Sequence, residues 1–233
     1  MVKELTRQLT PPILWHILSE LKHRSKRTTT QRFPGNPVQQ DLDLYWNAEF
    51  AQVLDTWGIG NTWHEIVFLV ANCSGDVLDI ACGTGKTMEI VSQLANIEIY
   101  GCDISDFLIQ KAVERGIPQS NLMVCDATQT HYQDNQFDYS YSIGSLEHFT
   151  DEGIDQFVRE CYRITKHKTF HMVPTSKSGQ NEGWTKTVQS FFNNSPEWWL
   201  GKFRAVYENV YTLDSLWKDD ISVGKWLVAD KKS

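Results

Sequence analysis

From residue 75 onward the sequence alternates between short apolar runs and amphipathic stretches, and this alternation leaves few possible folds. The apolar runs have the length and composition of buried strands, and the amphipathic stretches repeat their apolar residues with helical spacing. The predicted strands cover residues 77–81, 97–102, 122–125, 137–143 and 168–173. Because strands connected through helices pair in parallel, we expect an α/β fold with a mostly parallel sheet and helices on both faces.

The chain after Pro174 departs from this alternation. The proline ends the fifth predicted strand, and an aromatic-rich insertion follows over about residues 174–205. Two further β-like runs, residues 206–213 and 221–229, flank the turn-forming residues 218–220. We therefore expect a C-terminal hairpin that adds an antiparallel strand to the sheet.

Residues 1–74 are predicted to form an N-terminal helical cap, or lid, on a domain that spans residues 75–233. Apolar residues have helical spacing over residues 42–70, with a glycine turn in the middle that divides the stretch into two helices. The segment 28–40 contains Thr, Gln, Gly and Pro and predicts a flexible connection.

The stretch 11–27 combines an amphipathic helix with a basic cluster, Lys22 to Arg27. Two interpretations stay open for it. The helix packs on its own domain with solvated basic residues, or it rests on an anionic membrane surface or a partner.

Composition excludes several classes of protein. Acidic residues number 29 against 22 basic ones, and a net charge of −7 disfavours a nucleic-acid partner. No apolar stretch approaches the roughly 20 residues of a transmembrane helix. The 5 cysteines form no C-x-x-C pair, so we expect neither a disulfide framework nor a thiolate metal site, and a reducing cytoplasm is the predicted location.

A glycine loop follows the first predicted strand, in the sequence LDIACGTGKT of residues 78–87. Ligands of open α/β sheets bind at such carboxyl ends of strands. A phosphate-binding P-loop needs its first glycine at the position of Ile80, within the strand, so that interpretation fails. The dinucleotide pattern G-x-G-x-x-G has its third position at Met88, where a side chain hinders close packing.

Residues 77–85 resemble motif I of the class I S-adenosylmethionine-dependent methyltransferases, with Ala81 at the first glycine position. The resemblance implies a Rossmann-like domain with S-adenosylmethionine as cofactor and S-adenosylhomocysteine as product. It also implies that Asp79 lies near the methionine ammonium group. Ala81, Gly83 and Gly85 would let the backbone approach the methionine portion of the cofactor.

Further positions after the next strands fit the same family. In the resemblance Asp103 accepts hydrogen bonds from the ribose hydroxyls, and Asp126, followed by Ala127, accepts from the adenine amino group. Ile104 and Ile143 are expected to be walls of the adenine and methionine subsites, although each is equally compatible with ordinary core packing.

Aromatic residues on both sides of the glycine loop suggest a covered pocket. Tyr45 and Trp57 are candidates for a lid whose rings favour a sulfonium by cation–π attraction. The aromatic group around Trp184, Trp198 and Trp199 is expected at the opposite lip, with the acceptor between the two groups.

The segment of residues 141–149 resembles the family's Leu-Glu-His segment beside the sulfonium, and it makes His148 the candidate base. The alternative is that Glu147 and His148 only cap and orient the next helix. Histidines and carboxylates show no metal-ligand spacing, so no metal is expected.

These observations predict a methyltransferase that acts on a small-molecule acceptor. The first hypothesis for the acceptor is an oxygen of a sugar, or of a sugar-linked precursor of a surface polysaccharide, including a precursor with a phosphoryl-type group. The alternatives are an N-methyltransferase of another small metabolite and a noncatalytic protein that binds S-adenosylmethionine. The sequence leaves the oligomeric state open.

Overall fold

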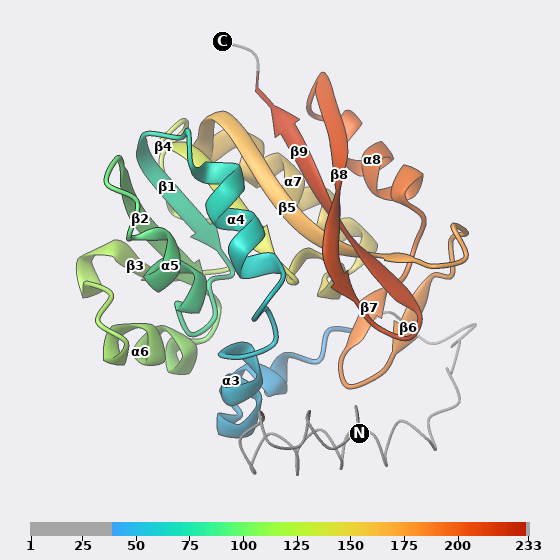
Figure 1. Cartoon of the computed structure of the whole chain (residues 1–233), viewed down its shortest axis with the longest axis horizontal. Helices are drawn as coiled ribbons and strands as arrows, with labels where there is room; N and C mark the ends of the chain where they lie inside the picture. Colours follow the sequence, from blue (N-terminus) through green and yellow to red (C-terminus); the bar gives the residue numbers. More distant parts are fainter. Residues whose placement is uncertain (1–38, 232–233) are drawn as a thin grey trace, which may run out of the picture.

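The computed structural model describes residues 39–231, so the expectations for residues 1–38, the basic helix among them, lie outside the described residues. A twisted sheet in the order β3-β2-β1-β4-β5-β9-β8 forms its centre (Figure 1). Its strands are β1 (Gly75–Ile80), β2 (Ile97–Asp103), β3 (Leu122–Val124), β4 (Phe137–Ile143), β5 (Thr165–Ser176), β8 (Asn209–Lys218) and β9 (Ser222–Asp230). β1 to β5 pair in parallel and β9 pairs antiparallel with β5 and β8, which confirms the predicted fold class.

Helices cover both faces of this sheet. They are α3 (Ala48–Leu54), α4 (Thr62–Val70), α5 (Lys86–Val91), α6 (Asp106–Glu114), α7 (Asp151–Ile164) and α8 (Pro196–Arg204), with the short 3₁₀ turns η1 (Leu42–Trp46), η2 (Gln119–Asn121) and η3 (Leu146–His148). Side chains of α7 and α8 belong to one buried cluster, and those of α4, α5 and α6 belong to another. The two clusters lie on opposite faces of the sheet.

The central strands are apolar on both sides because both faces are covered. In β1, Val77 packs into the cluster with α4 to α6, and its neighbour Leu78 packs into the cluster with α7 and α8; both are fully buried. A continuous apolar run, rather than an alternating one, is what such a strand requires. The sequence analysis predicted the parallel strands from these continuous apolar runs.

The last third of the chain corrects two expectations. Pro174 does not end its strand, because β5 continues to Ser176 while pairing with β9. Pairing with β4 stops at Met172, so beyond it β5 has an unpaired side, and a proline is tolerated at such an edge. The aromatic insertion is also more regular than expected, since it contains a small hairpin of β6 (Trp184–Lys186) and β7 (Ser190–Phe192) followed by α8.

Glu65 joins α4 to the C-terminal hairpin. One carboxylate oxygen accepts a hydrogen bond from the backbone N–H of Leu216 at 2.6 Å. The other accepts from the Ser215 hydroxyl and from the Trp226 indole, both at 2.7 Å. A carboxylate with three donors is well satisfied, so this contact fixes α4 against the antiparallel edge of the sheet.

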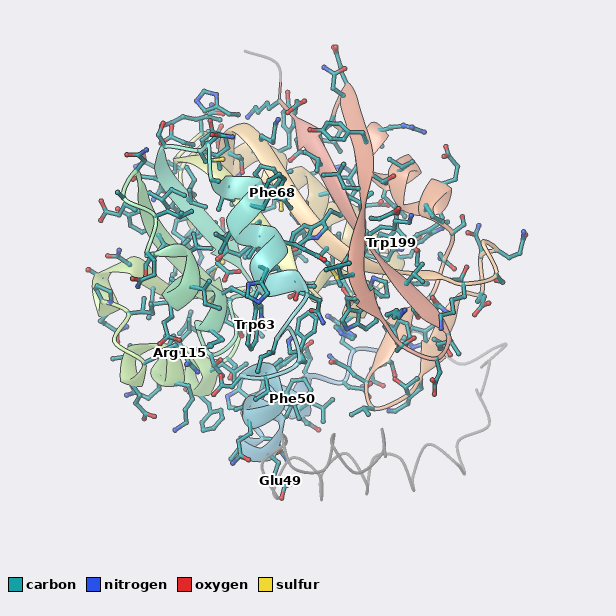
Figure 2. The ribbon with its side chains drawn as sticks, viewed as in Figure 1. Glu49, Phe50, Trp63, Phe68, Arg115 and Trp199 are labelled. Carbon is teal, nitrogen blue, oxygen red and sulfur yellow. The ribbon has the colours of Figure 1, made fainter. Side chains whose placement is uncertain are left out.

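We expect Glu65→Ala to lower the free energy of unfolding by about 2 kcal/mol, because three donors lose their charged acceptor. Urea unfolding of the whole chain measures this. Glu49→Ala is the matched control, since Glu49 extends into solvent from α3 (Figure 2) and its loss costs only a few tenths of a kcal/mol. Equal stability of the two variants would contradict the assigned role of Glu65.

Candidate functional site

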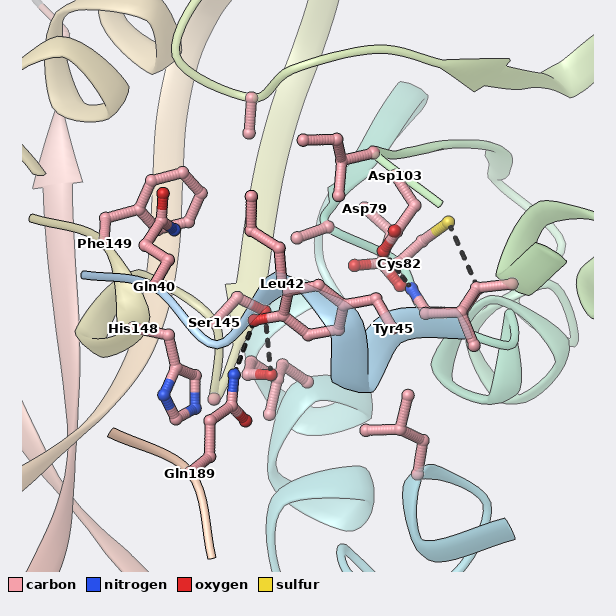
Figure 3. Close-up of a pocket in the computed structure, with 18 of the residues that line it drawn as sticks. Gln40, Leu42, Tyr45, Asp79, Cys82, Asp103, Ser145, His148, Phe149 and Gln189 are labelled. Carbon is pink, nitrogen blue, oxygen red and sulfur yellow. Dashed lines mark hydrogen bonds between the residues drawn. The ribbon is translucent and has the colours of Figure 1, made fainter. Parts of the chain in front are cut away.

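A cavity opens at the carboxyl ends of β1, β2 and β4, where the strand order reverses between β1 and β4. This position is the ligand site of open α/β sheets. Figure 3 shows Asp79 and Asp103 toward one end of the cavity and His148 and Gln189 toward the other. The sequence-predicted residues that line it are Tyr45, Trp57, Asp79, Ala81, Gly83, Asp103, Ile104, Asp126, Ala127, Ile143 and His148.

The glycine loop has the left-handed backbone that small residues permit. Ala81, Gly83 and Gly85 have φ angles of 59°, 56° and 72°. A Cβ on Gly85 would lie 2.8 Å from the Cβ of Ala112 in α6, so this glycine allows α5 to begin close to α6. Gly85 itself lies outside the cavity lining. Its place therefore supports packing of the loop rather than close approach to a ligand.

Asp103 holds the glycine loop in place from the end of β2. One of its carboxylate oxygens accepts from the Gly83 N–H and the other from the Ser105 N–H, both at 2.9 Å. Burial raises the pKa of Asp103 to about 6, although these backbone hydrogen bonds oppose the rise. Each oxygen keeps a further lone pair, so the carboxylate remains able to accept hydrogen bonds from a ligand.

Asp79 is the most deeply desolvated acid of the cavity. It is 2% exposed, and the Thr87 hydroxyl at the start of α5 donates a hydrogen bond to it. Burial raises the pKa of Asp79 to about 7, and the nearby Asp103 adds to the rise. A buried carboxylate beside another acid is stabilised by a cationic ligand.

Asp126 occupies a different environment, since its residue is exposed. Its Oδ1 accepts from the backbone N–H and from the hydroxyl of Thr128, at 2.8 and 2.7 Å. This local turn fixes the carboxylate at the rim of the cavity. Ala127 and Ile104 line the cavity together with Asp126.

The N-terminal elements form the opposite wall. Tyr45 of η1 and Trp57 both line the cavity, and the Tyr45 hydroxyl accepts from the Gln189 side chain at 2.6 Å. Asp41 accepts from Lys186 and from the Ser190 N–H, at 2.8 and 2.7 Å. These contacts, which we call the Asp41 clasp, attach η1 to the β6–β7 hairpin.

The prediction that aromatic residues of the insertion form one lip of the cavity is wrong. Trp199 is fully buried and donates its indole N–H to the Pro174 carbonyl at 3.1 Å, in the core between β5 and α8 (Figure 2). Trp184 and Trp198 pack against the same cluster. Of the insertion residues, Gln189 is the one that reaches the cavity. The apolar character of these residues does not show whether an aromatic side chain packs in the core or lines a pocket.

Sequence reasoning also missed a polar network behind the loop. Asp55, after α3, accepts from the Thr84 hydroxyl and from Arg115, each at 2.5 Å. Arg115 also donates to the Thr84 carbonyl at 2.9 Å. The network ties α3, the glycine loop and the end of α6 together. No local sequence motif predicts this network, because its members are separated by about thirty residues or more.

Glu147 and His148 lie side by side in η3. The Nδ1 of His148 is 2.7 Å from the Ser190 carbonyl, and a carbonyl only accepts, so Nδ1 carries the proton and Nε2 keeps a lone pair. Nε2 is 3.7 Å from Oε1 of Glu147. Burial lowers the pKa of His148 to about 4 and raises the pKa of Glu147 to about 8.

Between residues 39 and 231 no helix has both the length and the apolar character that crossing a bilayer requires. Within the same range no three His, Cys, Asp or Glu side chains gather closely enough to hold a metal ion.

Comparison with known proteins finds a family match over the central part of the chain. The family described as "Methyltransferase domain" matches residues 77–168, a segment that begins in β1 and includes Asp79, Asp103, Asp126 and His148. Residues 77–168 are therefore similar to a methyltransferase domain, and the chain shares its fold with a solved methyltransferase. The match covers the central β1–β5 region, and the N-terminal wall and the C-terminal hairpin lie outside it.

Curated relatives of the methyltransferase domain belong to longer proteins. Phosphoethanolamine N-methyltransferase 1 of Arabidopsis thaliana is 35% identical over 127 residues, which are 52% of this chain and 26% of that protein. Probable tRNA methyltransferase 9B of Mus musculus is 37% identical over 89 residues, 38% of this chain and 19% of that protein. The chain thus spans about a quarter or less of these relatives.

Solved structures share the fold at low identity. The Burkholderia thailandensis 1,6-didemethyltoxoflavin-N1-methyltransferase, solved with bound 1,6-didemethyltoxoflavin and S-adenosylhomocysteine, has a TM-score of 0.67 and 11% identity. The alignment covers 88% of this chain and 95% of that one. The PH0226 protein of Pyrococcus horikoshii has a TM-score of 0.58 and 19% identity, with 84% and 96% covered.

We expect Asp79→Asn to stabilise the ligand-free methyltransferase domain. The pKa of Asp79 is higher in the folded chain than the ordinary aspartate value, so the folded state loses stability as the pH rises from about 4 through about 7. Asparagine removes this loss, and we expect a gain of about 1 kcal/mol at pH 7.5 and little change at pH 4. Urea unfolding at both pH values measures it; a loss of stability at pH 7.5 would contradict the assignment.

Proposed function

We propose that this protein transfers a methyl group from S-adenosylmethionine to a small-molecule acceptor. The observation that carries the proposal is the pair of buried carboxylates, Asp79 and Asp103, around a glycine loop at the ends of adjacent strands. Such a site suits an ammonium group and a diol, and it repels the phosphates of a nucleotide. The fold shared with a methyltransferase solved with S-adenosylhomocysteine supports the same cofactor.

The residues present fit this cofactor. Asp79 would hold the methionine ammonium, Asp103 would accept from the ribose hydroxyls, and Asp126 at the rim would accept from the adenine amino group, with Ile104 and Ala127 beside the purine. When bound, S-adenosylmethionine supplies an electrophilic methyl group, so the protein has to orient the acceptor, exclude water and remove a proton.

His148 is the proposed base. Its Nδ1–H is held by the Ser190 carbonyl, which leaves the Nε2 lone pair available to an acceptor. The lowered pKa keeps the ring neutral at pH 7, the form that accepts a proton. The alternative, that His148 only orients the chain before α7, predicts unchanged turnover when the ring is replaced.

The acceptor atom is the finer part of the proposal. An oxygen of a sugar or sugar-linked precursor was the first hypothesis, and the amide side chains of Gln40 and Gln189 in the lining suit a hydroxylated ligand. The nitrogen alternative has support from the similar proteins, because both phosphoethanolamine N-methyltransferase 1 and the toxoflavin enzyme are named for methylation at nitrogen.

We expect Asp103→Ala to weaken S-adenosylhomocysteine binding by ten- to a hundredfold, the effect of removing hydrogen bonds to a charged acceptor. Titration calorimetry measures it. Asp134→Ala is the control, because Asp134 is exposed and pairs with Arg163. Failure of the unaltered protein to bind S-adenosylhomocysteine would refute the proposed function, and near-normal affinity of Asp103→Ala would refute only the ribose assignment.

We expect His148→Asn to lower kcat by about a hundredfold or more while cofactor affinity stays unchanged, because the amide replaces the Nδ1 donor toward Ser190 but offers no base. An acceptor screen that follows S-adenosylhomocysteine formation supplies the assay. The control His131→Asn changes an exposed histidine. Absence of turnover with any acceptor, despite cofactor binding, would favour the noncatalytic alternative.

A further inference from the structure

Ser190 connects the candidate base to an acid outside the cavity lining. Its carbonyl oxygen is 2.7 Å from Nδ1 of His148, and its backbone N–H donates to Oδ2 of Asp41 at 2.7 Å. The N–H and the C=O of one strand residue point to the same side of the strand, so both contacts lie along one edge of β7. Gln189, the residue before Ser190, lies at the same end of the cavity as His148 (Figure 3). Any shift of Ser190 therefore moves the group that holds the imidazole ring.

Asp41 contacts both strands of the β6–β7 hairpin. Its Oδ1 accepts from the Lys186 side chain at 2.8 Å, and Lys186 lies directly opposite Ser190 in the pairing of β6 with β7. Burial alone would raise the pKa of Asp41, but the hydrogen bonds from Lys186 and Ser190 outweigh burial and lower it. Asp41 is therefore ionised at neutral pH, and a charged acceptor makes a stronger hydrogen bond to the Ser190 N–H than a neutral one does.

Two acids influence the ring of His148 from different directions. Glu147 faces Nε2, with its Oε1 3.7 Å away. Asp41 is bound to the residue that contacts Nδ1. Burial lowers the pKa of His148 to about 4, while the Ser190 carbonyl and the charge of Asp41 oppose this fall. The charge of Asp41 thus favours the protonated ring, which is the form that a base takes once it has accepted a proton.

We propose that Asp41 is a positioning residue for methyl transfer, which holds Ser190 so that the Ser190 carbonyl keeps His148 in the Nδ1–H tautomer. This proposal rests on the proposed function, in which His148 is the base. A base oriented by a third group is a common arrangement in enzymes, and there an acid often bonds the ring directly. In this protein a backbone carbonyl bonds the ring, and the acid holds the residue that carries the carbonyl.

The proton balance of the reaction leaves Asp41 unchanged. The acceptor passes one proton to Nε2 of His148 as its oxygen or nitrogen forms the bond to the methyl carbon, and the electron pair of the broken S–C bond stays on sulfur. The imidazolium keeps its Nδ1–H on the Ser190 carbonyl and returns the added proton to water. Asp41 acts only through Ser190 and through its charge, because it lies outside the cavity lining.

The first test reads the tautomer of His148 directly, by ¹H–¹⁵N correlation NMR on the full chain at pH 7, with the ring signals assigned by their loss in His148→Asn. We expect the Nδ1–H tautomer in the unaltered protein. Asp41→Leu has a similar size but no acceptor for the Ser190 N–H, so we expect a mixture of both tautomers. Asp41→Asn keeps an acceptor and should keep the Nδ1–H form, as should the control Asp43→Leu, which changes an exposed acid of η1.

The second test separates turnover from binding. In the acceptor screen we expect Asp41→Leu to lower kcat by about tenfold or more, while the affinity for S-adenosylhomocysteine stays within about threefold. Asp41→Asn should recover most of the lost turnover because it restores the hydrogen bond to Ser190. Lys186→Met removes the ion pair but leaves the bond between Asp41 and Ser190, so it should lower kcat less than Asp41→Leu does.

The outcomes that overturn the proposal are distinct from those that refute the proposed function. An Nε2–H tautomer in the unaltered protein overturns it without any variant. It is also overturned if Asp41→Leu keeps the Nδ1–H tautomer, if Asp43→Leu changes the tautomer equally, or if Asp41→Leu loses S-adenosylhomocysteine affinity in proportion to kcat, as a mere anchor of the cavity wall would. Unchanged turnover of His148→Asn would instead refute the base assignment and, with it, the proposal.

Discussion

The hydrogen bond from the Gly83 N–H to the Asp103 carboxylate is the contact on which the cavity depends. It joins the loop after β1 to the end of β2, so the two strands present their acids to one space. The loop tolerates this position because Ala81 and Gly83 adopt left-handed φ angles. Burial of Asp79 and Asp103 then raises their pKa values, which makes the free site electrostatically unfavourable and a cationic ligand favourable.

The second half of the site follows the same physical principle with different residues. Oε2 of Glu147 is desolvated without a hydrogen-bond partner, and His148 is desolvated as a neutral ring whose tautomer Ser190 fixes. Burial raises the pKa of Glu147 and lowers the pKa of His148. Burial of ionisable groups therefore costs stability at Asp79 and Asp103 and again at η3, as is typical of positions kept for ligands rather than for the core.

The sequence predicted the parts of the fold that local pattern determines. Apolar runs covered on both faces marked the parallel strands. Asp79 and Asp103, near the carboxyl ends of β1 and β2, could be expected in one space because these strand ends meet at one edge of the sheet. The predictions for Pro174 and Trp199 were wrong because both depend on tertiary neighbours. Pro174 lies where one side of β5 is unpaired, and Trp199 donates a hydrogen bond to a carbonyl in the core. The contacts of Gln189 with Tyr45, and of Arg115 with Asp55, join distant segments and leave no periodic signal.

The Asp41 clasp connects positions separated by 149 residues, between the first described turn and the β6–β7 hairpin. During synthesis η1 can contact the start of α6 through Tyr45 and Trp46, but its contacts with the β6–β7 hairpin cannot form until the chain has been made and folded past Ser190. Closing so long a loop costs entropy that only the finished sheet and α8 can offset. A truncated or incompletely folded chain can therefore form the glycine loop and its acids but not the closed cavity, so ligand binding reports that the whole chain has folded.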